Sequence, residues 1–279
     1  MARRGTNKGG VSGGPKPPRN GSRRGRSAQG PKGGTSADEV VLYGLHAVEA
    51  ALRNEARHAL ALHATEPAVE RLSERFDLPQ ALAVNVVDTS AITRLTGPEA
   101  VHQGVALTCR PLDRLDESEL FHLADARLVV VLDQITDPHN VGAILRSAVA
   151  LDVDAVLTTA RESARETGVL AKSASGALDM VRLVAVRNLS KALSELAAMR
   201  FSVIGLDSDG PDSLEATLER PVERVALVLG SEGKGLREKT REACTALARL
   251  DMPGAIRSLN VSNAAVLALY VARRALDRG

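Results

Sequence analysis

Apolar residues between residues 38 and 110 fall into short blocks whose spacing changes from one block to the next. Strands carry such residues in runs or at every second position, whereas helices carry them three and four residues apart. We expect strands at 40–42, 59–63, 82–87 and 104–108, and helices at 45–53, 66–76 and 89–95. This succession predicts a small α/β domain over residues 38–110.

From residue 127 the same alternation continues with longer apolar runs. Only Val and Leu stand between Arg127 and Asp133, a composition typical of a strand that is covered on both faces. We expect strands at 127–133, 154–158, 181–186, 202–206, 224–229 and 247–251, and helices at 140–151, 168–175, 189–199, 236–246 and 260–277. Residues 127–279 are therefore predicted to form an open, largely parallel sheet, which binds ligands at the carboxyl ends of its strands.

Residues 111–126 lie between these two predicted domains. They contain Pro111 and five acidic residues, and their helical periodicity is weak. A proline and a run of acids are typical of connecting segments. We therefore interpret residues 111–126 as a linker.

Residues 1–37 form a basic arm. They hold nine of the 36 Lys and Arg residues and no Asp or Glu, which leaves 27 basic and 34 acidic residues in the rest of the chain. Ten of the 23 glycines also lie in the arm, and its few aliphatic side chains cannot build a core. We expect the arm to be disordered alone and to neutralise phosphates of a polyanion, with a merely solubilising tail as the alternative.

Composition excludes several classes of protein. No apolar run approaches the ~18 residues of a membrane span, and the arm lacks the apolar stretch of a secretory signal, so we expect a cytoplasmic protein without membrane contact. Cys109 and Cys244 are too few for a disulfide framework or a Cys-rich zinc site. Because His46, His102 and His139 lie in separate segments without a ligand-spaced pair, we expect no metal.

The first segment that suggests chemistry, D-P-H-N-V-G-A-I-L-R-S-A at 137–148, follows the predicted strand 127–133. Asn140 is a favoured residue type at a helix start, and a plain cap is one interpretation of it. Arg146 lies near the ligand-binding edge of the sheet, where a cation can meet an alkoxide or a phosphate. A surface salt bridge is the alternative role for Arg146.

The second segment, L-V-L-G-S-E-G-K-G-L at 227–236, turns a buried strand into a glycine-rich loop. Gly230, Gly233 and Gly235 let the backbone approach a ligand closely. Their spacing matches neither the Walker A pattern nor the dinucleotide fingerprint G-x-G-x-x-G. Glu232 is either a solvated acid of the turn or a group that fixes the loop or the substrate.

The third segment, L-D-M-P-G-A-I-R-S-L-N-V-S-N-A-A at 250–265, leads from a strand end into the last helix. Ser258 and Asn260, both residue types that cap helices, flank Leu259. This turn should lie beside the Gly230 loop, because both follow strands of one sheet. Backbone amides and carbonyls from the two turns can together hold an adenosine.

In this order, the three segments resemble the signature motifs of the SpoU (TrmH-like) RNA 2′-O-ribose methyltransferases of the SPOUT superfamily. The matching strings are N-V-G-x-x-x-R, L-G-S-E-G-x-G-L and S-L-N-V-S. The earlier region, with Y-G-L-H-A-V-E-A-A-L at 43–52 and H-Q-G-V-A at 102–106, is similar to the ribosomal-protein-like substrate-binding domain of the ribosomal RNA guanosine methyltransferases in that family.

The resemblance implies a parallel sheet whose C-terminal segment threads a trefoil knot. It also implies S-adenosylmethionine bound in the knot of an obligate homodimer. By position in the motifs, the implied cofactor-binding residues are Gly230, Leu250 and Leu259, and the implied catalytic residues are Asn140, Arg146, Glu232, Ser258 and Asn260.

The activity that the resemblance implies is methylation of a ribose 2′-hydroxyl, most simply on a guanosine of 23S ribosomal RNA. A guanidinium is normally protonated, so our preferred role for Arg146 is stabilisation of a developing alkoxide. The alternative is that Arg146 becomes a base only when an RNA phosphate and the partner subunit complete the site. Two alternatives stay open at this point: a transfer RNA guanosine-2′-O-methyltransferase, and a noncatalytic RNA-binding protein of ribosome assembly with the same fold.

Overall fold

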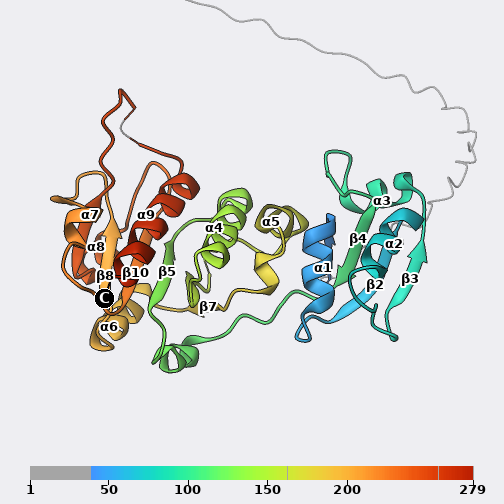
Figure 1. Cartoon of the computed structure of the whole chain (residues 1–279), viewed down its shortest axis with the longest axis horizontal. Coiled ribbons are helices and arrows are strands. Elements are labelled where there is room, and N and C mark those ends of the chain that lie inside the picture. The colour runs from blue at the N-terminus through green and yellow to red at the C-terminus, as the bar shows by residue number, and fades with distance from the viewer. Residues whose placement is uncertain (1–38, 162, 257, 279) are drawn as a thin grey trace, which may run out of the picture. The chain divides into compact units, whose positions relative to one another are not determined.

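The computed structural model describes residues 39–161, 163–256 and 258–278. The basic arm at 1–37, which we expect to be disordered, lies outside the described residues. Two β-sheets organise the rest of the chain, one in the region 39–110 and one in the region 127–278 (Figure 1). We call these the first-sheet region and the second-sheet region.

The first-sheet region has four strands in the order β1-β4-β2-β3. β4 pairs antiparallel with β1 and β2, whereas β3 pairs parallel with β2. The prediction of a small α/β fold is confirmed, and each of its seven expected elements is present. They are β1 (Val40–Tyr43), α1 (Leu45–Arg53), β2 (Ala59–Ala64), α2 (Glu66–Ser73), β3 (Ala83–Val86), α3 (Thr89–Thr96) and β4 (Val105–Cys109).

The segment at 111–126, which we expected to be a linker, is partly folded. It contains a 3₁₀ helix, η1 (Glu117–Leu123), whose Leu120 and Leu123 are buried. Leu115 donates its amide to the carbonyl of Leu183 at 3.2 Å and accepts from the amide of Ala185 at 2.8 Å. Its leucines therefore attach this segment to the edge of the second sheet, which its acidic composition did not indicate.

The second sheet has seven strands in the order β7-β6-β5-β10-β8-β11-β9, and every pair is parallel. This confirms the predicted open parallel sheet. The sequence patterns missed the short elements η2, β9 and α7. The elements are β5 (Leu128–Asp133), α4 (Pro138–Ala150), β6 (Ala155–Thr159), α5 (Gly168–Ala174), η2 (Ala177–Asp179), β7 (Leu183–Val186), α6 (Leu189–Ala198), β8 (Ser202–Leu206), β9 (Asp212–Ser213), α7 (Leu214–Thr217), β10 (Val225–Gly230), α8 (Glu238–Ala243), β11 (Ala246–Arg249) and α9 (Val261–Leu276).

Both faces of the second sheet are covered. In β5, Leu128, Val130 and Leu132 belong to one buried cluster, whereas Val129 and Val131 belong to another on the opposite face. Successive side chains of a strand point to opposite faces, so a strand between two layers must be apolar throughout. This explains the unbroken Val and Leu run of the sequence.

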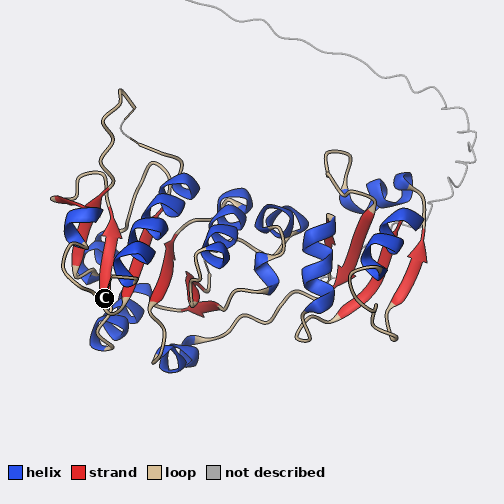
Figure 2. Ribbon diagram, in the orientation of Figure 1, coloured by secondary structure: helices blue, strands red, loops and turns tan. Residues whose placement is uncertain are grey.

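Helices supply the two covering layers. Ile144 of α4 and Ala265 of α9 lie in the first cluster, and Leu120 of η1 and Leu193 of α6 lie in the second. Figures 1 and 2 show α4 and α9 next to each other over β5 and β10. None of the helices in the described part of the chain is long and apolar enough to cross a membrane.

Candidate active site

The carboxyl ends of β8, β10 and β11 surround a pocket of about 350 Å³. This lies within the range of about 300–1,000 Å³ that is usual for small-molecule sites. The turns after the three strands and the start of α9 line it. The turn at 258–259 thus lies beside the Gly230 loop, as expected, and five of the predicted site residues line the pocket: Gly230, Glu232, Leu250, Ser258 and Leu259.

The glycine-rich loop is closed on itself. The amide of Ser231 donates to the carbonyl of Gly235 at 3.2 Å, and the amide of Gly235 donates back to Ser231 at 2.9 Å. Gly233 and Gly235 have φ angles of 78° and 65°, a conformation that favours glycine. At Gly230 an added Cβ would lie 2.3 Å from the carbonyl carbon of Gly235. The three glycines of the loop therefore present backbone to the pocket, next to Ser231 and Glu232.

Three polar side chains from separate segments meet beside this loop. Glu232 Oε1 accepts from Asn140 Nδ2 at 2.9 Å and from Asn260 Nδ2 at 2.5 Å. Asn260 Nδ2 also donates to Asn140 Oδ1 at 3.0 Å. The three motifs that are distant in sequence are therefore joined by one hydrogen-bond network.

The two asparagines differ in their relation to helix ends. Asn260 is the N-cap of α9 and accepts from the amide of Ser262 at 2.9 Å. Asn140 is not a cap, because α4 begins earlier and its N-cap is Asp137, which accepts from the amide of His139 at 3.1 Å. The interpretation of Asn140 as a plain cap is thus wrong. Its largely buried carboxamide contacts the other motifs instead.

An ion pair between a buried carboxylate and a partly exposed arginine supports the end of the loop. Asp133, at the carboxyl end of β5, is fully buried and pairs with Arg237 Nε at 2.7 Å. Its second oxygen accepts from the amide of Arg237 at 2.9 Å. The segment that leaves the glycine loop is therefore tied to the central strand.

Sequence reasoning missed Asp207, Ser208 and Met252, which also line the pocket. Asp207 and Ser208 directly follow β8, whose strand was predicted, so the rule that ligands bind at carboxyl strand ends pointed to them. Asp207 forms an ion pair with Arg241. Its carboxylate therefore holds the loop after β8 to the segment before β11.

Arg146 is the one predicted site residue that lies apart from the pocket and the hydrogen-bond network. It is exposed on α4 and makes no hydrogen bond or ion pair with any described residue. It follows Asn140 by six positions, which is about 120° away around the helix axis. The surface salt bridge that we considered for Arg146 is not formed within the described chain.

No group of three or more His, Cys, Asp or Glu side chains in the described residues is arranged to hold a metal. His102 contacts Thr93 and the amide of Gly104, and His139 contacts Ser173. His102 and His139 thus serve local hydrogen bonding.

Comparison with known proteins agrees with this geometry. Residues 127–270 match the model of the SpoU rRNA Methylase family, and residues 41–115 match a model described as RNA 2′-O ribose methyltransferase substrate binding. A 23S rRNA (guanosine-2′-O-)-methyltransferase RlmB of Xylella fastidiosa is 38% identical over 242 residues, which span 84% of this chain and 95% of that protein. The corresponding protein of Pseudomonas aeruginosa is 37% identical over 82% of this chain and 94% of its own.

Solved structures share the fold. The SpoU methyltransferase AviRb of Streptomyces viridochromogenes aligns with a TM-score of 0.70 at 20% identity, over 87% of this chain and 91% of that one. An AdoMet-bound rRNA methyltransferase of Sinorhizobium meliloti aligns with a TM-score of 0.68 at 22% identity, over 86% of this chain and 88% of that one. Because the family model spans more than half of the chain and the sequence relatives match along nearly their full length, the chain belongs to the SpoU rRNA methylase family.

Proposed function

We propose that this chain transfers a methyl group from S-adenosylmethionine to the ribose 2′-hydroxyl of a guanosine in 23S ribosomal RNA. Its family makes it an RNA 2′-O-ribose methyltransferase, and the names of its relatives specify the guanosine and the 23S RNA. The observation that carries the proposal is the network of Asn140, Glu232 and Asn260 beside the glycine-lined pocket.

The pocket suits S-adenosylmethionine. Gly230 lines the pocket without a side chain, so its backbone can approach a bound ligand, and Leu250 and Leu259 add apolar surface. We propose that these three residues hold the cofactor, with adenosine against the two turns. The cofactor supplies the methyl group from a sulfonium, which leaves as a neutral thioether.

The difficult partner in this reaction is the ribose hydroxyl, which is a poor nucleophile until it loses its proton. We propose that Asn140, held by Glu232 and Asn260, orients the target ribose, and that Ser258 on the exposed turn assists it. Arg146 stabilises the oxygen as its negative charge develops. An electrostatic role fits a guanidinium, which normally stays protonated.

We propose a homodimer in which Arg146 of a second copy completes each site. Arg146 is exposed and without a partner in the described chain, which leaves it free to reach another molecule. On α9, Val266, Leu267 and Tyr270 are 40%, 45% and 58% exposed and recur at helical spacing. An apolar stripe of this kind on a helix adjoining α4 supports a second copy as its cover.

The remaining proposals concern organisation. Residues 38–110 bind the RNA substrate and resemble a ribosomal protein. Residues 111–126 connect this region to the catalytic domain at 127–279. The basic arm adds contacts with RNA phosphates. The segment after β11 threads a trefoil knot, supported by the return of the chain from β11 to α9 past the Gly230 loop. A ribosomal RNA substrate implies a cytoplasmic enzyme.

One experiment tests the function directly. The purified protein is incubated with methyl-labelled S-adenosylmethionine and, separately, with unmodified 23S ribosomal RNA and bulk transfer RNA, and the labelled ribose is mapped. We expect label on one guanosine of the 23S RNA and on no transfer RNA. Label on transfer RNA alone would make this a transfer RNA enzyme, and no label with intact RNA binding would make it a noncatalytic binder.

A further inference from the structure

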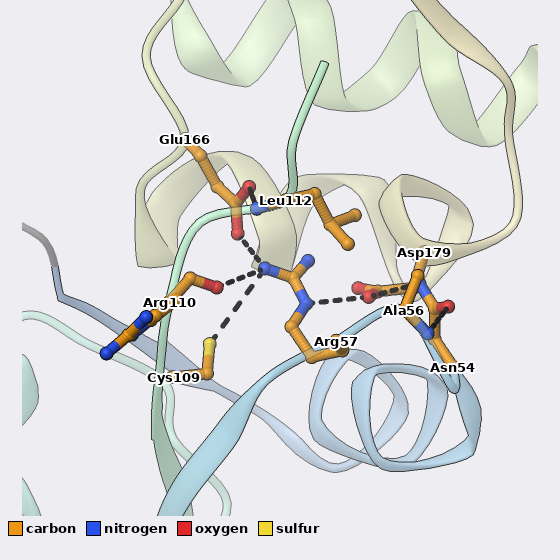
Figure 3. Close-up of polar contacts among 8 residues, drawn as sticks. All are labelled: Asn54, Ala56, Arg57, Cys109, Arg110, Leu112, Glu166 and Asp179. Atoms are coloured by element: carbon orange, nitrogen blue, oxygen red, sulfur yellow. Dashed lines mark hydrogen bonds and ion pairs between the residues drawn. The ribbon is translucent and has the colours of Figure 1, made fainter. Parts of the chain in front are cut away.

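Arg57 is buried where the two regions meet. Its side chain is 0% exposed and it lies just before β2 of the first-sheet region. Nε donates to Asp179 Oδ1 at 2.9 Å, and Nη1 forms an ion pair with Glu166 (Figure 3). Nη1 also donates to the carbonyl of Arg110 at 3.2 Å. One arginine of the first-sheet region thus holds two carboxylates of the second-sheet region.

Each carboxylate has a further partner outside the second-sheet region. Asp179 Oδ1 accepts from Asn54 Nδ2 at 3.1 Å, and Glu166 Oε2 accepts from the amide of Leu112 at 2.9 Å. Asp179 ends η2 and Glu166 precedes α5, so the contacts hold two separate parts of the second-sheet region. We call Arg57, Glu166 and Asp179 the interdomain lock.

The backbones around the lock approach each other closely. An added Cβ at Gly168 would lie 2.5 Å from the ring of Tyr43, and one at Gly176 would lie 3.0 Å from Ala50 Cβ. At the other end of α1, Lys172 Nζ donates to Gln103 Oε1 at 2.7 Å. One buried apolar cluster also includes residues of both sheets. The first-sheet region and the second-sheet region therefore pack against each other along the length of α1.

The charges in the lock depend on one another. Burial alone would lower the pKa of Arg57, but its hydrogen bond to Asp179 and the charges of Asp179 and Glu166 raise that pKa, so the guanidinium stays charged. The side chains of Asp179 and Glu166 are only 2% and 11% exposed. Without Arg57, both carboxylates would lose their cation in a largely buried place, which is strongly unfavourable.

We infer that Arg57 is a positioning residue for RNA methylation, which fixes the RNA-binding region relative to the catalytic site through the interdomain lock. The inference rests on the proposed RNA-binding role of residues 38–110. The link to the site runs through α5, which packs against α4 so tightly that a Cβ on Gly142 would lie 2.7 Å from the carbonyl of Leu170. α4 carries Asn140, so a displaced α1 and α5 would move RNA relative to that carboxamide.

The test compares the full-length wild type with Arg57→Met. Hydrogen–deuterium exchange should become at least about tenfold faster in α1, α5 and η2 and stay unchanged in β10, because only the region around the lock opens. On 23S RNA transcribed in vitro, kcat/KM should fall about tenfold or more. The calorimetric Kd for S-adenosylmethionine should remain within about twofold, because none of the lock residues lines the pocket.

A rescue variant separates a charge effect from lost packing. Combining Arg57→Met with Glu166→Gln and Asp179→Asn removes the unpaired carboxylates and should restore slow exchange and much of kcat/KM. The matched control is Lys191→Met, which breaks an exposed ion pair with Glu195 on α6, outside the RNA-binding region and the pocket, and should change neither readout.

Two results would overturn the inference. One is an Arg57→Met protein with wild-type exchange and wild-type kcat/KM, and the other is an equal loss of cofactor binding and activity, which would place the effect in the catalytic fold. A failure of the proposed function looks different, because the wild type itself would then leave 23S RNA unlabelled.

Discussion

Asn140 uses both ends of its carboxamide, donating to Glu232 and accepting from Asn260. Asn140→Ala removes both contacts, and Asn140 itself does not line the pocket. We expect the single-turnover methylation rate to fall about 100-fold, because a misplaced ribose costs that much. The Kd for S-adenosylmethionine, measured by calorimetry, should change little.

A control variant distinguishes a loss of catalysis from a loss of stability. Asn188 is the N-cap of α6 and accepts from the amide of Lys191 at 3.1 Å, remote in the sequence from the three motifs. Asn188→Ala should lower the free energy of unfolding by about 1 kcal/mol and leave the methylation rate unchanged. Equal rates for the Asn140 and Asn188 variants would remove Asn140 from the mechanism.

Burial of Cys109 predicts a pH dependence of stability. Burial raises the pKa of its thiol to about 12, above the ordinary value near 9. The Cys109 thiol therefore ionises at a lower pH in the unfolded chain than in the folded one. Its contribution to the free energy of unfolding is fully present below about pH 9 and is lost as pH rises toward about 12, at about 1.4 kcal/mol per pH unit. Urea unfolding between pH 8 and pH 11 should show a flatter decline for Cys109→Ala than for wild type, and parallel curves would contradict the assignment.

At the scale of elements, spacing predicted the long helices and strands because each one presents a full apolar face. It missed η2, β9 and α7, which are two to four residues long and show no period. The start of α4 was placed at Asn140, whereas Asp137 and Pro138 begin it. The residues 137–140 offer two cap-type side chains. Asp137 is the cap, because it accepts from the amide of His139, whereas Asn140 donates to Glu232.

The glycine loop gives a prediction at this scale. An added Cβ on Gly230 would lie within 2.5 Å of backbone atoms of Gly235 and Leu236, so Gly230→Ala must displace the loop that lines the pocket. We expect the Kd for S-adenosylmethionine to rise at least about tenfold, as measured by calorimetry. Gly254→Ala is the control, because a Cβ there meets nothing within 4 Å. An unchanged Kd for the Gly230 variant would show that this loop does not hold the cofactor.

At the scale of the whole molecule, the sequence was least informative about contacts between distant segments. The three motifs were expected to meet because the carboxyl ends of parallel strands share one edge. Nothing comparable pointed to Arg57 and Asp179, which are 122 residues apart and lie in no recognisable pattern. The leucines of residues 111–126 stand between acidic residues in the sequence, so we interpreted this partly folded segment as a linker.

The position of Arg146 leads to a prediction about the assembled protein. If each site takes Asn140 from one copy and Arg146 from the other, Asn140→Ala and Arg146→Ala homodimers are both inactive. A dimer that contains one chain of each kind keeps one complete site. After refolding the two variants together in equal amounts, half of the dimers are mixed, so we expect about one quarter of wild-type activity.

If both residues act within one chain, the mixture stays inactive, because no chain then carries both side chains. Arg220→Ala provides the control, since Arg220 is also exposed and without a partner in the described chain, and this variant should be fully active alone. Sedimentation of each sample establishes that the mixture is dimeric. Recovery of activity therefore has a single structural cause: the exposed guanidinium on α4 reaches the pocket of the other copy, and a monomer would hold cofactor without methylating RNA.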